Sequence, residues 1–142
     1  MKFKGLLLLC LFALPFAGDA QVYNQWPAQQ SSLSSAIAPA TPAVATVKSS
    51  AGIITHLSCF NVLATPVYVK LYDVSGSITL GTTAATYEYM CPGNTGGAGF
   101  VASLPLSIAF VNSIKYAVTN AISLTDNTGI TANSVIVNVG YN

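Results

Sequence analysis

Apolar and polar residues alternate with a period of two along much of the chain after residue 52. In residues 67–72, Val67, Val69 and Leu71 would share one face of a strand, and the side chains between them would point the other way. Similar alternation, or enrichment in β-branched and aromatic residues, occurs in residues 53–62, 85–91, 106–110, 114–119 and 134–141. The pattern predicts a series of short strands.

Turn-forming residues separate these segments. Pro, Gly, Asn, Asp and Ser gather in residues 64–66, 75–76, 92–97, 111–113 and 126–129. No segment has the pattern of a long helix. About 6–8 short strands separated by turns predict an all-β domain over residues 51–142, folded as an antiparallel β-sandwich or jelly roll.

The alternation leaves Tyr68, Lys70 and Tyr72 on the second face of the strand at residues 67–72. An antiparallel sheet commonly buries one face and exposes the other. We therefore expect these three residues to form a mixed aromatic and polar stripe on an exposed sheet. The alternative is that another layer covers one of the tyrosines.

Residues 1–20 have the pattern of a secretory signal peptide. Lys2 and Lys4 precede an apolar run, and small residues follow at positions 18 and 20. A basic start, about 7–15 apolar residues and a small-residue exit are typical of such leaders. The run is shorter than the ~20 residues that span a bilayer. We expect a secreted chain that begins at Gln21, without membrane insertion after cleavage; a buried N-terminal helix is the alternative.

Residues 21–50 are rich in Ala, Ser, Gln and Pro. Such a composition disfavours a helix and offers little to bury, so we expect a flexible or extended N-terminal arm. A short helix within residues 31–38 is the alternative. Tyr23 and Trp26 are the large aromatic residues of this arm, and they would anchor it to its own domain or to a partner.

Charge is scarce and balanced after the leader. Three lysines, Lys48, Lys70 and Lys115, oppose three carboxylates, Asp73, Glu88 and Asp126. Neutralising phosphates requires clustered Lys or Arg, and the chain has no Arg. Nucleic acid and anionic membranes are therefore not expected as partners. A neutral surface rich in Ser, Thr and Asn gives little repulsion between copies, which favours packing against neighbours.

Cys59 and Cys91 are the two cysteines outside the leader. An even number of cysteines in an exported chain favours a disulfide. It would close a loop of about 33 residues and stabilise the fold by roughly 3–4 kcal/mol. Two separate buried thiols are the alternative.

Residues that support catalysis or metal binding are sparse. His56 is the only histidine and lies within a predicted strand, and the carboxylates come from separate segments. Residues 126–129 lack the spaced oxygen ligands of a calcium loop, and residues 93–97 lack the Lys-Ser/Thr of a phosphate loop. We therefore expect no catalytic residue, cofactor or metal. An enzyme would need Asp73 and Glu88 to face each other across a cleft.

A set of motifs covers residues 48–142. It comprises Ser50-Ala51-Gly52-Ile53, Cys59-Phe60-Asn61, residues 66–73, Gly81-Thr82, the glycine-rich residues 93–99, and residues 106–110, 114–119 and 126–141. Together these motifs resemble a family of small all-β accessory proteins of tailed bacteriophages. The resemblance implies a virion component without catalytic residues, such as a capsid decoration or a head or tail accessory protein.

Two functions follow as hypotheses. The first is a non-enzymatic, virion-like structural or surface accessory protein that assembles with copies of itself or with a larger protein shell. The second is a secreted carbohydrate- or surface-binding module, in which Tyr68, Tyr72 and Trp26 provide flat rings for stacking on a glycan.

Overall fold

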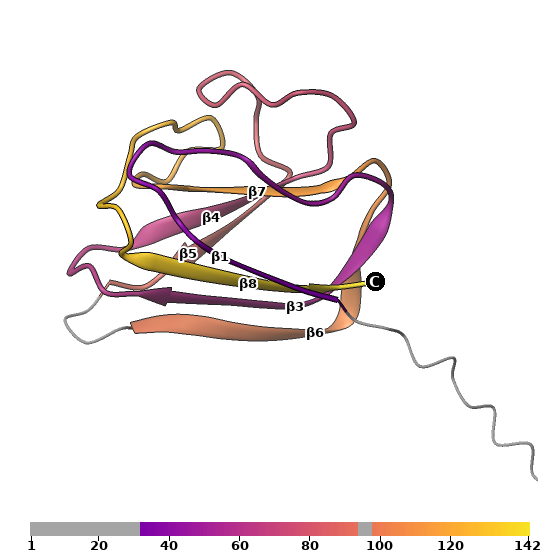
Figure 1. Cartoon of the computed structure of the whole chain (residues 1–142), viewed down its shortest axis with the longest axis horizontal. Helices are drawn as coiled ribbons and strands as arrows, with labels where there is room; N and C mark the ends of the chain where they lie inside the picture. Colours follow the sequence, from indigo (N-terminus) through magenta and orange to yellow (C-terminus); the bar gives the residue numbers. More distant parts are fainter. Residues whose placement is uncertain (1–31, 94–97) are drawn as a thin grey trace, which may run out of the picture.

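The computed structural model describes residues 32–93 and 98–142, which form an all-β domain (Figure 1). The eight strands are β1 (Ser32–Ile37), β2 (Ala45–Lys48), β3 (Gly52–Asn61), β4 (Val67–Tyr72), β5 (Tyr87–Cys91), β6 (Ala98–Phe110), β7 (Ile114–Thr119) and β8 (Val135–Tyr141). The described residues contain no helix that could cross a membrane. The predicted all-β class is confirmed. The predicted leader and Trp26 lie outside the described residues.

The strands form two antiparallel sheets of four strands each. One sheet has the order β1-β8-β3-β6 and the other has the order β2-β7-β4-β5. Eight strands in these two orders have the connectivity of a jelly roll. In Figure 1 the two sheets lie one above the other, and the last strand, β8, runs between β1 and β3.

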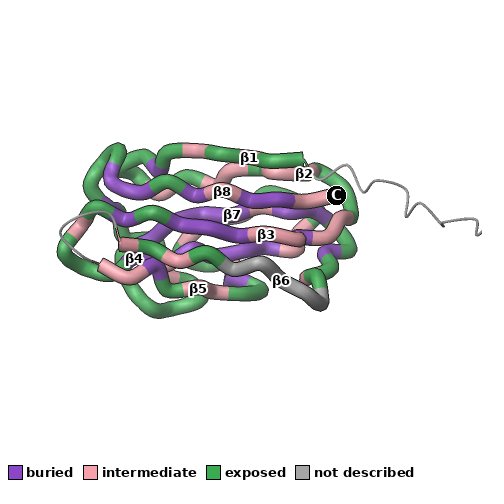
Figure 2. The backbone as a smooth tube through the Cα atoms, turned by 90° about the horizontal axis from the view of Figure 1, so that it is seen from below, coloured by how far each residue is buried: buried purple, intermediate pink, exposed green. Residues whose placement is uncertain are grey.

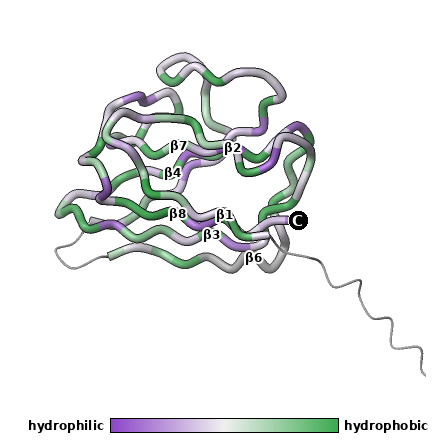
Figure 3. The backbone as a smooth tube through the Cα atoms, viewed as in Figure 1, coloured by the Kyte–Doolittle hydropathy of each residue, from purple (hydrophilic) through white to green (hydrophobic). Residues whose placement is uncertain are grey.

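The hydrophobic core lies between the two sheets. Val67, Val69 and Leu71 of β4 are fully buried and belong to one cluster with Val137 and Val139 of β8. Figure 2 shows buried residues concentrated along β3, β7 and β8, and Figure 3 shows hydrophobic stretches along β7 and β8. The face that the alternation assigned to the core is therefore the core face.

One long side of the sandwich, between β5 and β6, is closed by covalent and aromatic contacts. The predicted disulfide is present: Cys59 of β3 is bonded to Cys91 of β5, and the Cα atoms of the two cysteines are 6.1 Å apart. This bond joins the two sheets. Two aromatic pairs add to this side, with ring centroids 5.9 and 6.1 Å apart: Tyr87 with Phe110, and Tyr89 with Phe100. The disulfide is compatible with an extracytoplasmic protein.

The sandwich begins earlier than the expected boundary at residue 51. β1 and β2 both lie within residues 21–50, which the sequence assigned to an arm, and β1 is a strand where a short helix was the alternative. The sequence of β1, SLSSAI, has no strong strand pattern. Its conformation comes from pairing with β8, from Ser32 opposite Tyr141 to Ile37 opposite Ile136. Residues 32–50 therefore belong to the sandwich.

Candidate functional site

A row of exposed apolar side chains crosses the outer face of the β1-β8-β3-β6 sheet. Ile37 of β1 lies opposite Ile136 of β8, and Ile136 lies opposite Phe60 of β3. Directly opposed residues in a sheet project from the same face. The relative exposures are 57% for Ile37, 39% for Ile136 and 49% for Phe60. Three adjacent strands thus expose large hydrophobic side chains to solvent.

Further apolar side chains extend this row along the strands. Exposed hydrophobic residues at outward positions include Leu33 of β1, Val62 just after β3 and Val101 of β6. Gly99 of β6 lies opposite Phe60. An open hollow of about 140 Å³ lies beside this pair, and its lining includes Phe60, Gly99 and Val101. We call Leu33, Ile37, Phe60, Val62, Val101 and Ile136 the apolar face.

The sheet that carries the apolar face contains no charged residue. β1, β3, β6 and β8 have no Asp, Glu, Lys or Arg, whereas the opposite sheet carries Lys48, Lys70, Glu88 and Lys115. Two polar side chains on the outer face of this sheet bond to each other. Asn138 Nδ2 donates a hydrogen bond of 3.1 Å to Ser58 Oγ. The two sheets therefore present surfaces of different chemistry.

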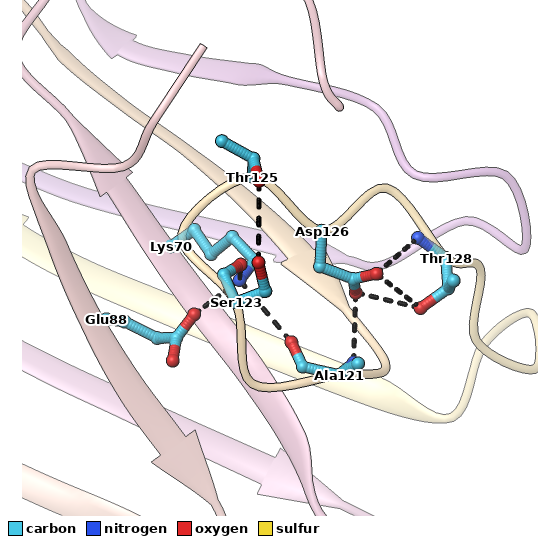
Figure 4. Close-up of polar contacts among 7 residues, drawn as sticks. All are labelled: Lys70, Glu88, Ala121, Ser123, Thr125, Asp126 and Thr128. Atoms are coloured by element: carbon cyan, nitrogen blue, oxygen red, sulfur yellow. Dashed lines mark hydrogen bonds and ion pairs between the residues drawn. The ribbon is translucent and has the colours of Figure 1, made fainter. Parts of the chain in front are cut away.

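Lys70, predicted to be exposed, is fully buried on the outer side of β4. Its Nζ forms an ion pair with Glu88 and donates to the carbonyl oxygens of Ser123 and, at 3.4 Å, Ala121 (Figure 4). An ammonium group has three N–H donors, and three acceptors meet it here. The hydrogen bonds from Lys70 therefore fasten the loop of residues 120–129 onto the sheet, and this loop covers Lys70.

Tyr72 is also fully buried, so its predicted role as a surface stacking platform is wrong. Its side chain clusters with Ala85 and Ala117. Its hydroxyl has no hydrogen-bond partner among the described residues. Burial, together with the negative charges of Glu88 and Asp126, raises the pKa of Tyr72 to about 12. A covered, neutral phenol offers no face to a sugar ring.

The three residues predicted to bind a surface do not form one described platform. Tyr68 is half-buried, with Met90 of β5 and Thr119 of β7 as its cross-strand neighbours. Tyr72 lies under the covering loops, and Trp26 is outside the described residues. Of the two that the structure describes, Tyr68 is the one partly open to a ligand.

The alternation along single strands did not predict the apolar face, although two strands carry a signal of it. In β8, Ile136 stands among the outward polar positions, between Val135 and Val137, which point inward. In β3, Phe60 follows Cys59 in the same way. Apolar residues at consecutive positions of a strand indicate that both faces are apolar.

The carboxylate of Asp73 binds backbone N–H groups of a turn. It accepts hydrogen bonds from the N–H groups of Val111 at 2.9 Å, Asn112 at 2.7 Å and Ser113 at 3.2 Å. Burial raises the pKa of Asp73, but these hydrogen bonds outweigh burial and lower it below its ordinary value. Asp73 therefore fixes the turn between β6 and β7, while Glu88 is paired with Lys70 on another part of the sheet.

Asp126 has an equivalent role within the loop of residues 120–129. It accepts hydrogen bonds from the backbone N–H of Ala121 at 2.9 Å and from the N–H and hydroxyl of Thr128 (Figure 4). Burial raises the pKa of Asp126, but these hydrogen bonds outweigh burial and lower it below its ordinary value. Within residues 32–93 and 98–142, no group of three His, Cys, Asp or Glu side chains lies where it could hold a metal ion.

Comparison of the chain with models of known protein families, with characterised proteins and with solved structures gives no match. The function is therefore inferred from the geometry and chemistry of the chain itself.

Proposed function

We propose that the protein is a non-enzymatic structural component that assembles with copies of itself or within a larger protein shell, and that the apolar face is its contact surface. The observation that carries this proposal is the exposed row of Ile37, Ile136 and Phe60 on a sheet without charged residues. Contiguous apolar patches on a protein surface commonly mark interaction sites. Removing such side chains from water contributes about 25 cal/mol per Å² of apolar area.

A second copy of the chain fits this surface. Phe60 projects beside the hollow over Gly99, so a two-fold arrangement would place Phe60 of each copy in the hollow of the other. A contact between identical patches requires this kind of self-complementarity. Because neither face carries charge, two copies approach without like-charge repulsion.

The size of the face favours assembly through many weak contacts. Four strands of 6 to 13 residues, about 4.8 Å apart and rising about 3.3 Å per residue, give a sheet face of roughly 570 Å². Stable, specific pairs bury about 800 Å² on each partner. One contact of this size is therefore weak, and assembly would gain strength from several contacts acting together.

A virion-like shell is the form of assembly that we propose, on the basis of the phage-family motifs in residues 48–142. The jelly-roll order supports this only in part, because viral capsid domains and lectin domains both use it. The carbohydrate-binding alternative is weakened by the burial of Tyr72. We expect neither the parent chain nor Tyr68→Ala to bind to a glycan array.

Assembly is tested by placing a charge on the apolar face. Both sheets lie within residues 32–142, so a chain that begins at Gln21 retains every described element. We expect this chain to form oligomers that grow with concentration in sedimentation velocity. Phe60→Lys should shift it to monomer, because a lysine facing its own copy would have to lose hydration without a partner.

The matched control is Ile122→Lys. Ile122 is 73% exposed but lies in the loop of residues 120–129, on the opposite sheet. This variant should assemble like the parent chain. A parent chain that remains monomeric at all concentrations and binds no particle surface would refute the proposal, and so would equal loss of assembly in both variants.

A further inference from the structure

The two long sides of the sandwich differ. The β5/β6 side is closed by the Cys59–Cys91 disulfide and two aromatic pairs. On the β1/β2 side, an open apolar cavity of about 90 Å³ remains between the edge strands. We call it the β1/β2 slot; its walls include Ala36, Ala38, Ala43 and Ala45, and its floor includes Tyr116 and Val118.

The slot is shaped for part of an aromatic ring. Its walls are mostly alanine side chains, which are too small to meet across the gap. Atoms that line an unfilled gap lose dispersion contacts on one side. A buried apolar cavity of about 150 Å³ accepts a whole benzene molecule. The smaller, open slot would therefore accept one edge of an aromatic side chain.

We infer that Trp26 of the same chain occupies the β1/β2 slot. Residues 21–31 lead directly into Ser32, the first residue of β1, and β1 forms one wall of the slot. This segment contains no charged residue, so no charge is desolvated when it docks. Trp26 is its largest apolar side chain, and aromatic residues gain most from burial.

The distances allow this docking within one chain. From Ser32 to Ala36, β1 advances four residues, or about 13 Å at the usual strand rise. From Ser32 back to Trp26 there are six residues, which span at most about 20 Å. The segment can therefore reverse direction and reach the slot. A tether this short gives an effective concentration in the millimolar range, which favours docking in the same chain over docking in a neighbour.

Fluorescence provides a direct test, because Trp26 is the only tryptophan of the chain. In the chain that begins at Gln21, we expect its emission maximum at a shorter wavelength than that of free tryptophan, with weak quenching by acrylamide. Ala43→Leu fills the mouth of the slot from an exposed position. It should shift the emission to longer wavelength and raise the quenching constant several-fold. Ala36→Leu, from the opposite wall, should do the same.

The matched control is Ala84→Leu, which adds the same atoms at an exposed position away from the slot and should leave the emission unchanged. Circular dichroism of each variant checks that the sheets are intact. Solvent-like emission in the parent chain would overturn the inference, as would a short-wavelength emission that both slot variants leave unchanged. The shift should also be the same in Phe60→Lys and at all protein concentrations. A shift that appears only on concentration would place Trp26 in a neighbouring copy and refute docking within the chain.

Discussion

Lys70 shows how one buried charge can organise a surface loop. Its ammonium group meets Glu88 and two carbonyl oxygens of the loop of residues 120–129, and its side chain is completely buried. Burying a charge is costly unless it is paired and hydrogen-bonded. The position of the loop therefore depends on the Lys70 ammonium group beneath it.

We expect Lys70→Met to destabilise the protein by about 3–5 kcal/mol, because removing one partner leaves the other charge buried without compensation. The free energy of unfolding from urea titration measures this change. The double variant Lys70→Met, Glu88→Leu should recover part of the loss, since it removes both charges together. Equal stability of the single variant and the parent chain would show that Lys70 does not hold the loop.

Tyr72 makes stability depend on alkaline pH. Its pKa is about 12 in the folded chain, against about 10 when exposed. The raised pKa reflects a preference for the neutral form, so its contribution is complete below about pH 10 and is lost as pH rises toward about 12. In Tyr72→Phe, the unfolding free energy should fall less steeply over this range.

A residual alkaline loss should remain in Tyr72→Phe, because burial also raises the pKa of Tyr89 and Tyr116. At neutral pH, Tyr72→Phe should lie within about 1 kcal/mol of the parent chain, since the hydroxyl that it removes has no hydrogen-bond partner among the described residues. Identical pH profiles for the variant and the parent chain would contradict the assignment.

At this scale the sequence predicted which residues share a face but not which faces are covered. The period of two correctly placed Val67, Val69 and Leu71 together. It also placed Lys70 and Tyr72 together on the second face, but it contains no information about the loops that fold over that face. Lys70 bonds to a loop distant in sequence, and Tyr72 packs against Ala117 of β7 and against residues that follow β4 in the chain. A period of two does not register these contacts.

At the scale of elements, the pairing of β3 with β6 depends on a close approach of two backbones. Gly99 of β6 faces β3, and a Cβ atom there would lie 1.8 Å from the carbonyl oxygen of Cys59. No side-chain rotation relieves an overlap with backbone. The strands can come this close only because position 99 has no side chain.

We therefore expect Gly99→Ala to lower the unfolding free energy by at least about 1–3 kcal/mol, the usual cost of forcing extra atoms into a packed site. Gly76→Ala is the matched control, because a Cβ atom at position 76 would meet nothing within 4 Å. It should be neutral. Thermal melting of both variants measures the difference, and equal melting temperatures would exclude the close approach at Gly99.

The elements themselves were only partly predictable. The strands after residue 52 follow from alternation and turn residues, and the Cys59–Cys91 disulfide follows from their number and setting. β1 was missed because its serines and alanines carry little intrinsic strand preference. Its structure is imposed by hydrogen bonds to β8, from the far end of the sequence.

At the scale of the whole molecule, charge is segregated. All charged strand residues lie on the β2-β7-β4-β5 sheet, and the sheet with the apolar face has none. Two layers were predictable from the sequence. This segregation was not, because it depends on which strands share a sheet, and the jelly-roll order places β8 beside β1 and β3 rather than beside β7.

If assembly uses the uncharged sheet, it should be insensitive to ionic strength. We expect the association constant from sedimentation velocity to change little between about 0.05 and 0.5 M sodium chloride, because screening acts only on charges. Sulfate should strengthen association, since excluded salts favour burial of apolar surface. An association constant that falls steeply with sodium chloride would assign the contact to the charged sheet instead.

The central place of β8 in its sheet also has a consequence for biosynthesis. Until the ribosome has made residues 135–141, β1 has no neighbour on that side and β3 lacks one of its two. The β1-β8-β3-β6 sheet is therefore incomplete until residues 135–141 have been synthesised.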